Sequence, residues 1–263
     1  MRVDYHLHLR ASGDESDEPE HSLEAVERYL EQAAKRGVDE LGFTEHVYYF
    51  RQTEAIWDVS EQLEWCRFDL DEYCDLIVRA KRQGLPVKLG LEVDWVPERA
   101  DELGEILAPY PWDYLLGSVH WIDGLAVDSR PGLWERHSRE DVWALYAREL
   151  EAAARSGHFD VLAHPDLVKI FGDRVDWDWQ PVIEALDGVA LEVSTAGLHK
   201  PVGELYPDGA LLRGASRITL ASDAHVAEDV GRDLDAAVEH ARSAGFETVT
   251  VFEGRSSRQE PLR

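Results

Sequence analysis

Imidazole and carboxylate side chains close almost every short apolar run of this sequence. The runs are rich in β-branched residues and are typical of strands, so these polar groups fall where strands end. They are His6 and His8, Glu45 and His46, Glu92 and Asp94, His120, His164, Glu192, and Asp223 with His225. A lone histidine at a strand end usually has a structural role, but six at equivalent places are not explained in that way. The pattern therefore indicates a shared site.

These ligand types suit divalent metal ions. Nitrogen and oxygen donors without thiolate are typical of Zn²⁺, Mn²⁺ or Fe²⁺ sites. A zinc-type site takes about four ligands, so this number of candidates predicts two or three ions. Carboxylates crowded together would also repel each other unless cations compensate their charge. Multinuclear sites of this kind hydrolyse phosphate esters or amides through an activated water.

The remaining histidines and serines are interpreted differently. An ordinary polar role is expected for the five imidazoles in helical or loop contexts, which are His21, His137, His158, His199 and His240. Nucleophilic serine chemistry is not favoured, because the GxSxG motif is absent. Ser118, in GSVH, is interpreted as a small residue beside a crowded site.

The elements that would position these groups alternate between strand-like and amphipathic runs. Strands are expected at 2–8, 38–46, 86–94, 114–120, 159–166, 189–197, 217–225 and 248–252, and helices at 22–37, 60–83, 98–107, 138–157 and 227–243. Such alternation predicts a parallel sheet, and about seven units favour a closed barrel over a doubly wound sheet. Strand ends in a parallel barrel converge on one face, where active sites are built. The period of two residues points His6 and His8 the same way.

Composition excludes several classes of protein. The 263 residues are 44% hydrophobic and carry a net charge of −26, which argues against nucleic-acid or anionic-membrane partners. No apolar stretch is long enough to span a bilayer, and MRVDYHLHLR lacks the apolar run of a signal peptide. Cys66 and Cys74 do not support a disulfide framework, so a cytoplasmic location is the default expectation.

Seven motifs occur in a recognisable order. They are DYHLH, FTEH, GLEVD, LGSVHWIDG, DVLAHPDLVKIFG, LEVSTAGLHKPVGELYP and ASDAHVAEDVG. Together they resemble the polymerase-and-histidinol-phosphatase (PHP) superfamily, and HPDLVKIFG with STAGLHKP resembles its stand-alone histidinol-phosphatase branch. The resemblance covers nearly the whole chain. It implies one PHP domain over residues 1–263, folded as a distorted seven-stranded, TIM-barrel-like (β/α) barrel with a trinuclear metal site.

The resemblance also implies a ligand set. The first metal would be held by His6, His8, Glu92 and Asp223, the second by Glu92 as a bridge with His120 and His164, and the third by His46, His225 and a loop residue. Family members often place a histidine in that loop, eight residues beyond the first histidine of HxH. Here that offset falls on Asp14, with Glu15 as the fallback and a solvated acidic run as the alternative.

The activity implied is hydrolysis of a phosphomonoester by a metal-bridging hydroxide, with Glu92, Asp223 and His225 as the catalytic residues. A bound water or a site imidazole would protonate the leaving group. The predicted substrate contacts are Lys169, His199, Lys200 and Trp121, each with surface solvation or edge packing as the alternative. Family members commonly carry an arginine where this chain has His199, and this departure leaves the exact substrate open.

L-Histidinol phosphate is the leading substrate, because its cationic groups suit acidic walls around a metal-bound phosphate. The main alternative is another small phosphate ester, such as a nucleotide or sugar phosphate. A nuclease is disfavoured by the charge, and an amidohydrolase fits Glu92 and the SDAH motif less well. A non-catalytic metal-binding protein is the remaining class. Metal identity and oligomeric state stay open.

Overall fold

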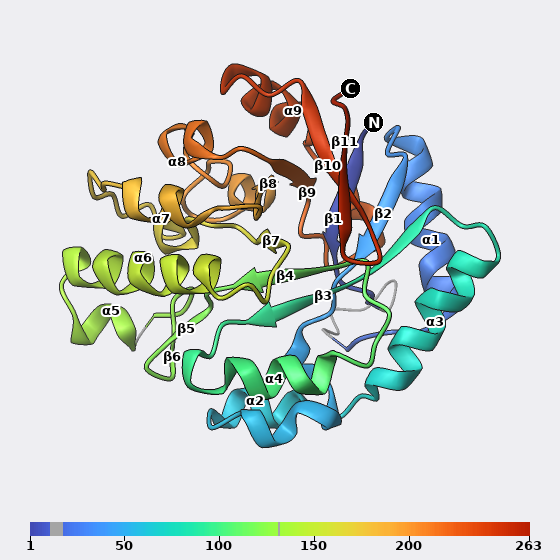
Figure 1. The fold of residues 1–263 in the computed structure, drawn as a ribbon, viewed down its shortest axis with the longest axis horizontal. Helices are drawn as coiled ribbons and strands as arrows, with labels where there is room; N and C mark the ends of the chain where they lie inside the picture. The colour runs from blue at the N-terminus through green and yellow to red at the C-terminus, as the bar shows by residue number, and fades with distance from the viewer. Residues whose placement is uncertain (11–17, 131) are drawn as a thin grey trace.

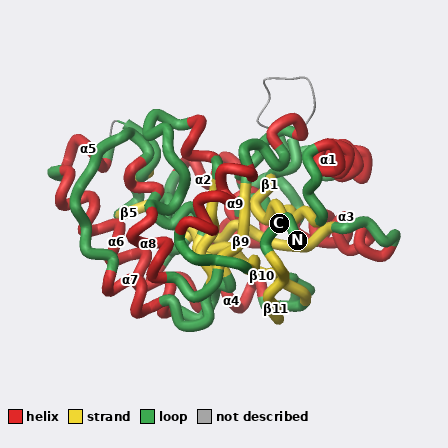
Figure 2. The backbone as a smooth tube through the Cα atoms, turned by 90° about the horizontal axis from the view of Figure 1, so that it is seen from above, coloured by secondary structure: helices red, strands yellow, loops and turns green. Residues whose placement is uncertain are grey.

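Seven parallel strands form the centre of the molecule. The computed structural model describes residues 1–10, 18–130 and 132–263. The sheet order is β1-β2-β3-β4-β7-β8-β9. The strands are β1 (Val3–Leu7), β2 (Glu40–Phe43), β3 (Val87–Asp94), β4 (Tyr114–Ser118), β7 (Val161–Leu162), β8 (Ala190–Ser194) and β9 (Ile218–Ala221). The sheet curls into a nearly closed barrel with helices outside it (Figures 1 and 2), so the predicted seven-stranded (β/α) barrel is confirmed.

The helices pack their apolar faces on the outside of this barrel. They are α1 (Leu23–Lys35), α2 (Ser60–Trp65), α3 (Leu70–Arg82), α4 (Ala100–Leu107), α5 (Leu133–Arg136), α6 (Arg139–Arg155), α7 (Gln180–Ala185), α8 (Gly209–Gly214) and α9 (Leu234–Ser243). Serine side chains cap the amino ends of α1 and α6. Ser22 accepts a hydrogen bond from the Ala25 N–H, and Ser138 accepts one from the Asp141 N–H. No helix in the described ranges is long and apolar enough to cross a membrane.

The single helix predicted over 60–83 is wrong. The chain instead forms α2 and α3, which are separated at residues 66–69. In the break, the N–H groups of Arg67 and Phe68 donate to the Tyr49 carbonyl instead of continuing the helix. Asp69 then starts α3 by accepting from the N–H groups of Asp71 and Glu72. A local side-chain cap and a tertiary backbone contact thus override the helical periodicity.

Other boundaries also differ from the predictions, and two of these differences have a clear cause in the backbone. The helix expected over 227–243 is a short 3₁₀ turn, Ala227–Asp229, followed by α9, because Gly231 adopts a φ of +69° between them. The strand expected over 159–166 pairs only at Val161–Leu162. It ends early because the chain turns at His164, where φ is +26°.

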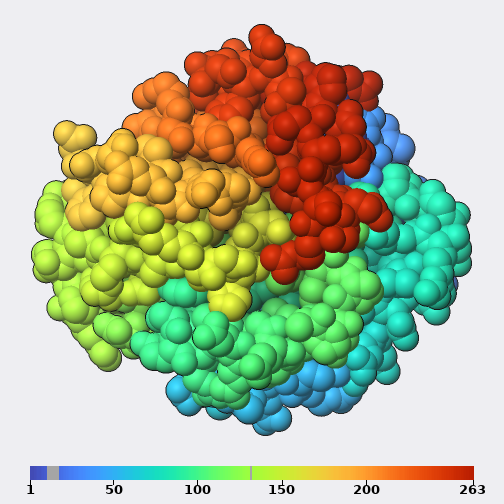
Figure 3. Space-filling view, viewed as in Figure 1, coloured from blue at the N-terminus to red at the C-terminus, as the bar shows by residue number. Residues whose placement is uncertain are grey.

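The end of the chain forms an antiparallel hairpin outside the barrel sheet. The predicted last strand is β10 (Thr248–Glu253), which pairs with the mostly exposed, unpredicted β11 (Ser256–Pro261). The hairpin crosses in front of the barrel strands in Figure 1, and C-terminal residues, in red, reach the middle of the face in Figure 3. Another small hairpin, β5 (Trp121–Ile122) with β6 (Leu125–Ala126), follows β4.

Aromatic rings fill the amino end of the barrel. Tyr114 of β4 stacks on Tyr5 of β1 with 5.1 Å between ring centroids, and Phe252 of the hairpin lies 5.3 Å from Tyr114. The Tyr114 hydroxyl donates to the Tyr5 carbonyl at 2.7 Å. Gly42 makes room for it, since a Cβ there would lie 1.8 Å from the Tyr114 oxygen. Because β1 and β4 are not neighbours in the sheet, this ring links two strands across the barrel interior.

The two cysteines are free and buried, as expected without a disulfide framework. Burial raises the pKa of the Cys66 thiol to about 11 and also raises that of Cys74. We expect a thiol-disulfide reagent to label less than one thiol per native chain at pH 8, and two once the chain is unfolded. Rapid labelling of both thiols in the native protein would contradict this. A Cys66→Ala variant should lower the unfolded count to one.

Candidate metal centre

The carboxyl ends of the barrel strands bring together most of the predicted ligands. β1 supplies His6, His8 follows it directly, β3 supplies Glu92, and the turns after β2, β4, β7 and β9 supply His46, His120, His164, Asp223 and His225. Strands position these side chains because each ends where the barrel opens. The predicted loop ligand, Asp14 or its neighbour Glu15, lies outside the described residues.

Glu92 lies at the centre of this group and is almost fully buried. Five imidazoles surround its two oxygens. Oε2 lies 2.7 Å from His46 Nδ1, 3.2 Å from His6 Nε2 and 3.5 Å from His8 Nε2, and Oε1 lies 3.0 Å from His164 Nε2 and 3.2 Å from His120 Nε2. Ser118 donates to Oε1 at 2.7 Å, so its side chain orients this carboxylate.

Asp223 faces two of these imidazoles, His6 and His8, from the turn after the edge strand β9. Its Oδ1 lies 3.6 Å from His6 Nε2, His8 Nε2 and His225 Nδ1. The His8 and His225 rings lie 4.3 Å apart between centroids. His225 is 45% exposed, whereas His6 and His8 are fully buried. The group therefore extends from the barrel interior to its surface.

Several buried ligand atoms in this group make no hydrogen bond of regular geometry, although some of them lie at ion-pair distance from one another. They are His6 Nε2, His8 Nδ1 and Nε2, His46 Nδ1, His164 Nδ1 and Glu92 Oε2. Four sets of three residues have ligand atoms that all lie within 4.8 Å of one another: His8, His46 and His225; His6, Glu92 and His164; His6, His8 and Asp223; and His46, Glu92 and His120. Buried polar atoms without partners are costly, and a shared cation satisfies them. The donor set therefore fits divalent metals.

The electrostatics keep both carboxylates ionised. Burial alone would raise the pKa of Glu92, but His6, His46 and His120 hold it well below its usual range. The pKa of Asp223 is likewise lowered against the effect of burial, chiefly by His6 and His8. Metals bind carboxylates in this form, so the site needs no proton loss from either group.

Three further buried carboxylates hold the imidazoles in place. Glu192 lies 2.8 Å from His6 Nδ1 and accepts from the His164 N–H at 3.1 Å, and Asp94 lies 2.9 Å from His120 Nδ1. Glu45 lies 3.6 Å from His8 Nδ1. Such contacts leave the opposite ring nitrogen, Nε2, aimed at the metal position. The sequence placed these carboxylates at strand ends, but the imidazole that each contacts was not predicted.

The predicted substrate contacts lie in different surroundings. Lys169 is fully buried, and its ammonium donates to Asp166 and to the Leu205 carbonyl. His199 is 41% exposed and lies 2.7 Å from Asp233, and Lys200 is exposed. As contacts to substrate, all of these stay predictions, and the geometry of Lys169 favours a structural role.

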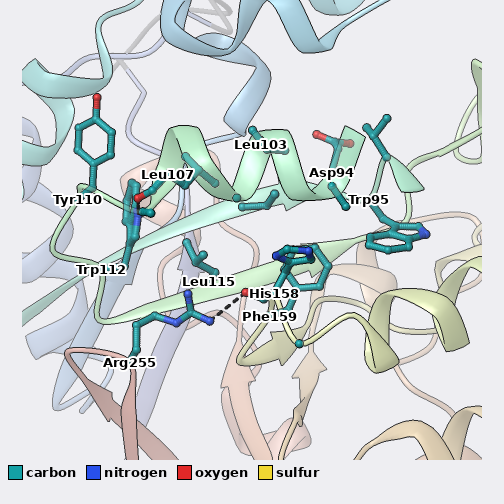
Figure 4. Close-up of a pocket in the computed structure, with 16 residues that line it drawn as sticks. Asp94, Trp95, Leu103, Leu107, Tyr110, Trp112, Leu115, His158, Phe159 and Arg255 are labelled. Carbon is teal, nitrogen blue, oxygen red and sulfur yellow. Dashed lines mark hydrogen bonds between the residues drawn. The ribbon is translucent and has the colours of Figure 1, made fainter. Parts of the chain in front are cut away.

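Trp121, the fourth predicted contact, lines a cavity of about 290 Å³ with Trp57 and Trp95. A separate cavity of about 220 Å³ lies beneath α4 (Figure 4). Leu103, Leu107 and Leu115 line it, and Arg255 donates to the His158 carbonyl at its edge. The ligand candidates in the described ranges do not line this second cavity.

Fold and site together define a metal-binding barrel hydrolase. The PHP domain model matches residues 4–196, and the chain belongs to the PHP family. A probable histidinol-phosphatase of Deinococcus radiodurans is 35% identical over 94% of this chain and 95% of its own length. The histidinol phosphate phosphatase of Lactococcus lactis, solved with zinc, L-histidinol and phosphate, superposes with a TM-score of 0.74, 22% identity and 98% coverage of both chains. A putative histidinol phosphatase from Listeria monocytogenes gives 0.73, with 20% identity and coverage of 89% and 99%.

Proposed function

We propose that this protein is a metal-dependent phosphomonoesterase that hydrolyses L-histidinol phosphate to L-histidinol and phosphate. The observation that carries the proposal is Glu92 with five imidazoles around it, facing Asp223. The histidinol-phosphatase names of the relatives support the choice of substrate. In the reaction, the phosphorus–oxygen bond of the ester breaks, water supplies the new oxygen on phosphorus, and the alcohol oxygen takes up a proton.

The residues divide into binding and catalytic roles under this proposal. Two or three divalent ions, Zn²⁺, Mn²⁺ or Fe²⁺, would be held by His6, His8, His46, Glu92, His120, His164, Asp223 and His225, with Asp14 as a further candidate. When bound, such ions activate water and neutralise charge on the phosphoryl oxygens. Glu92 and Asp223 orient the ligand imidazoles of His6 and His8 through their contacts with these two side chains. His225, at the surface, is placed to exchange a proton with solvent.

The proposed substrate contacts are two exposed residues and one half-buried residue. His199 and Lys200 follow β8, and Trp121 follows β4, so all three lie beyond the carboxyl ends of barrel strands. We propose that they contact the ester outside the metal ligands. We also propose that residues 197–263, beyond the family match, belong to the same domain, because β9 carries Asp223 into the shared site.

Metal analysis and a phosphate-release panel test the proposal on the protein as purified. We expect two or three equivalents of Zn, Mn or Fe per chain, and faster phosphate release from L-histidinol phosphate than from nucleotide or sugar phosphates. A chelator should abolish the activity, and re-addition of each metal singly should identify the one that restores it. Equal rates of phosphate release from all esters would refute the substrate assignment. If no ester releases phosphate with any metal-loaded sample, the proposed phosphomonoesterase activity is refuted.

A further inference from the structure

The barrel has a seam between its first and last strands. Among the described residues, β1 and β9 form the two edges of the sheet and share no ladder of hydrogen bonds. Near their carboxyl ends they meet through one bridge, between Leu7 and Ala224, with the His8 N–H donating to the Ala224 carbonyl at 2.9 Å. Asp223 lies next to this bridge, so the seam runs through the candidate metal centre.

Asp4, in the middle of the seam, is fully buried and accepts three hydrogen bonds. The Ser222 N–H donates to Oδ1 at 2.8 Å, the Ser222 hydroxyl donates to Oδ2 at 2.5 Å, and the Gly231 N–H donates to Oδ2 at 2.7 Å. All three donors come from the segment between β9 and α9. One carboxylate therefore holds both ends of residues 222–231 against β1.

The segment held in this way carries two of the candidate ligands. Asp223 and His225 both lie between Ser222 and Gly231 in the chain. Asp223 has a φ of +56°, a backbone conformation that persists only when the surrounding structure holds it. Gly231 has a φ of +69° and lies where a Cβ would come 2.8 Å from Val38. The path of the segment is thus fixed at its two ends by Asp4.

We infer that Asp4 is a positioning residue for the metal centre, which sets Asp223 and His225 against His6 and His8. The inference rests on the proposed function for its metals, but the contacts of Asp4 do not depend on them. Asp4 acts through Ser222 and Gly231 and does not itself touch a candidate ligand atom in the contacts described.

Only a carboxylate satisfies this arrangement. An ionised aspartate offers acceptors and no donor, which matches three donors converging on it. Asparagine keeps one oxygen but turns an NH₂ group toward an N–H or O–H donor, so at least one buried hydrogen bond is lost. Asp4→Asn is therefore a nearly isosteric change that loosens one end of the segment, and Ser222→Ala removes the hydroxyl donor alone.

The test measures metal affinity on the full chain. Wild type, Asp4→Asn and Ser222→Ala are stripped of metal, and Zn²⁺ binding is titrated against a chromogenic chelator while thermal unfolding is recorded with and without Zn²⁺. We expect the weakest-held Zn²⁺ to bind about 10- to 100-fold more weakly in Asp4→Asn, with a smaller loss in Ser222→Ala. Excess Zn²⁺ should restore the occupancy of Asp4→Asn.

Asp113→Asn is the matched control. Asp113 is also a buried aspartate that accepts backbone N–H groups, from Leu89 at 2.8 Å and Gly254 at 3.1 Å, but it lies at the amino end of β4. The Asp113→Asn variant should have a lower unfolding temperature and an unchanged Zn²⁺ affinity. Wild-type Zn²⁺ affinity in both Asp4→Asn and Ser222→Ala would overturn the positioning role. A wild type that binds Zn²⁺ but hydrolyses no ester would refute the proposed function instead.

Discussion

Replacing Glu92 with Gln is expected to lower kcat for L-histidinol phosphate by about a thousandfold or more, since a metal centre supplies several kcal/mol of transition-state stabilisation. Glu92 lies within 3.5 Å of five imidazoles, so its charge acts on most of the cluster. The amide has nearly the same shape, but it carries no charge and turns an NH₂ group toward ring nitrogens. Metal content should therefore fall together with kcat.

The measurement is phosphate release at saturating substrate, combined with metal analysis of the same sample. Glu105→Gln is the control, because Glu105 is exposed on α4 and should keep full activity and metal content. The loss in Glu92→Gln should persist when metal is added in excess. An active Glu92→Gln enzyme that retains its metals would remove Glu92 from the proposed site.

Replacing Lys169 with Met is expected to reduce the free energy of unfolding by about 3–5 kcal/mol, the loss typical when one partner of a buried ion pair is removed. The Lys169 ammonium lies 2.7 Å from Asp166 Oδ2, and both side chains are fully buried. It also donates to the Leu205 carbonyl at 2.8 Å and lies 5.3 Å from the centre of the Tyr206 ring. Without it, the Asp166 charge stays buried with no cation.

Urea unfolding of Lys169→Met measures this loss of unfolding free energy. Two further variants test its cause. Lys169→Met combined with Asp166→Asn removes both charges while keeping an acceptor for the Asp208 N–H, so it should recover much of the stability. Lys200→Met is the exposed control and should change stability by less than about 0.5 kcal/mol. A stable Lys169→Met protein with a raised KM for histidinol phosphate would instead support the predicted substrate contact.

The grouping of the candidate ligands followed from the sequence more closely than the bounds of the elements around them. Strand-end positions and the period of two were enough to group His6 and His8 with Glu92, because local geometry determines which face a strand residue takes. The break at Asp69 depends on a tertiary contact with Tyr49, which helical periodicity does not record.

Side-chain contacts between residues far apart in the chain could not be predicted from local sequence patterns. Glu192 contacts His6 across 186 positions, and Asp4 contacts Ser222 across 218. Nothing in the local pattern of either carboxylate names its partner, since the pairing depends on how the barrel closes. The burial of Lys169 was missed for the same reason, because a lysine in a loop is usually solvated.

Among the described residues, the aromatic rings of Tyr5, Tyr114 and Phe252 pack against one another toward the amino end of the barrel, away from the candidate metal centre. With the proposed function, we expect the ester to enter and both products to leave at the carboxyl ends of the strands, where the candidate metal centre lies. The ester and the products therefore use the same route. A new ester molecule cannot bind at the cluster until the previous phosphate has dissociated. Accumulated inorganic phosphate should accordingly slow turnover by occupying the candidate metal centre.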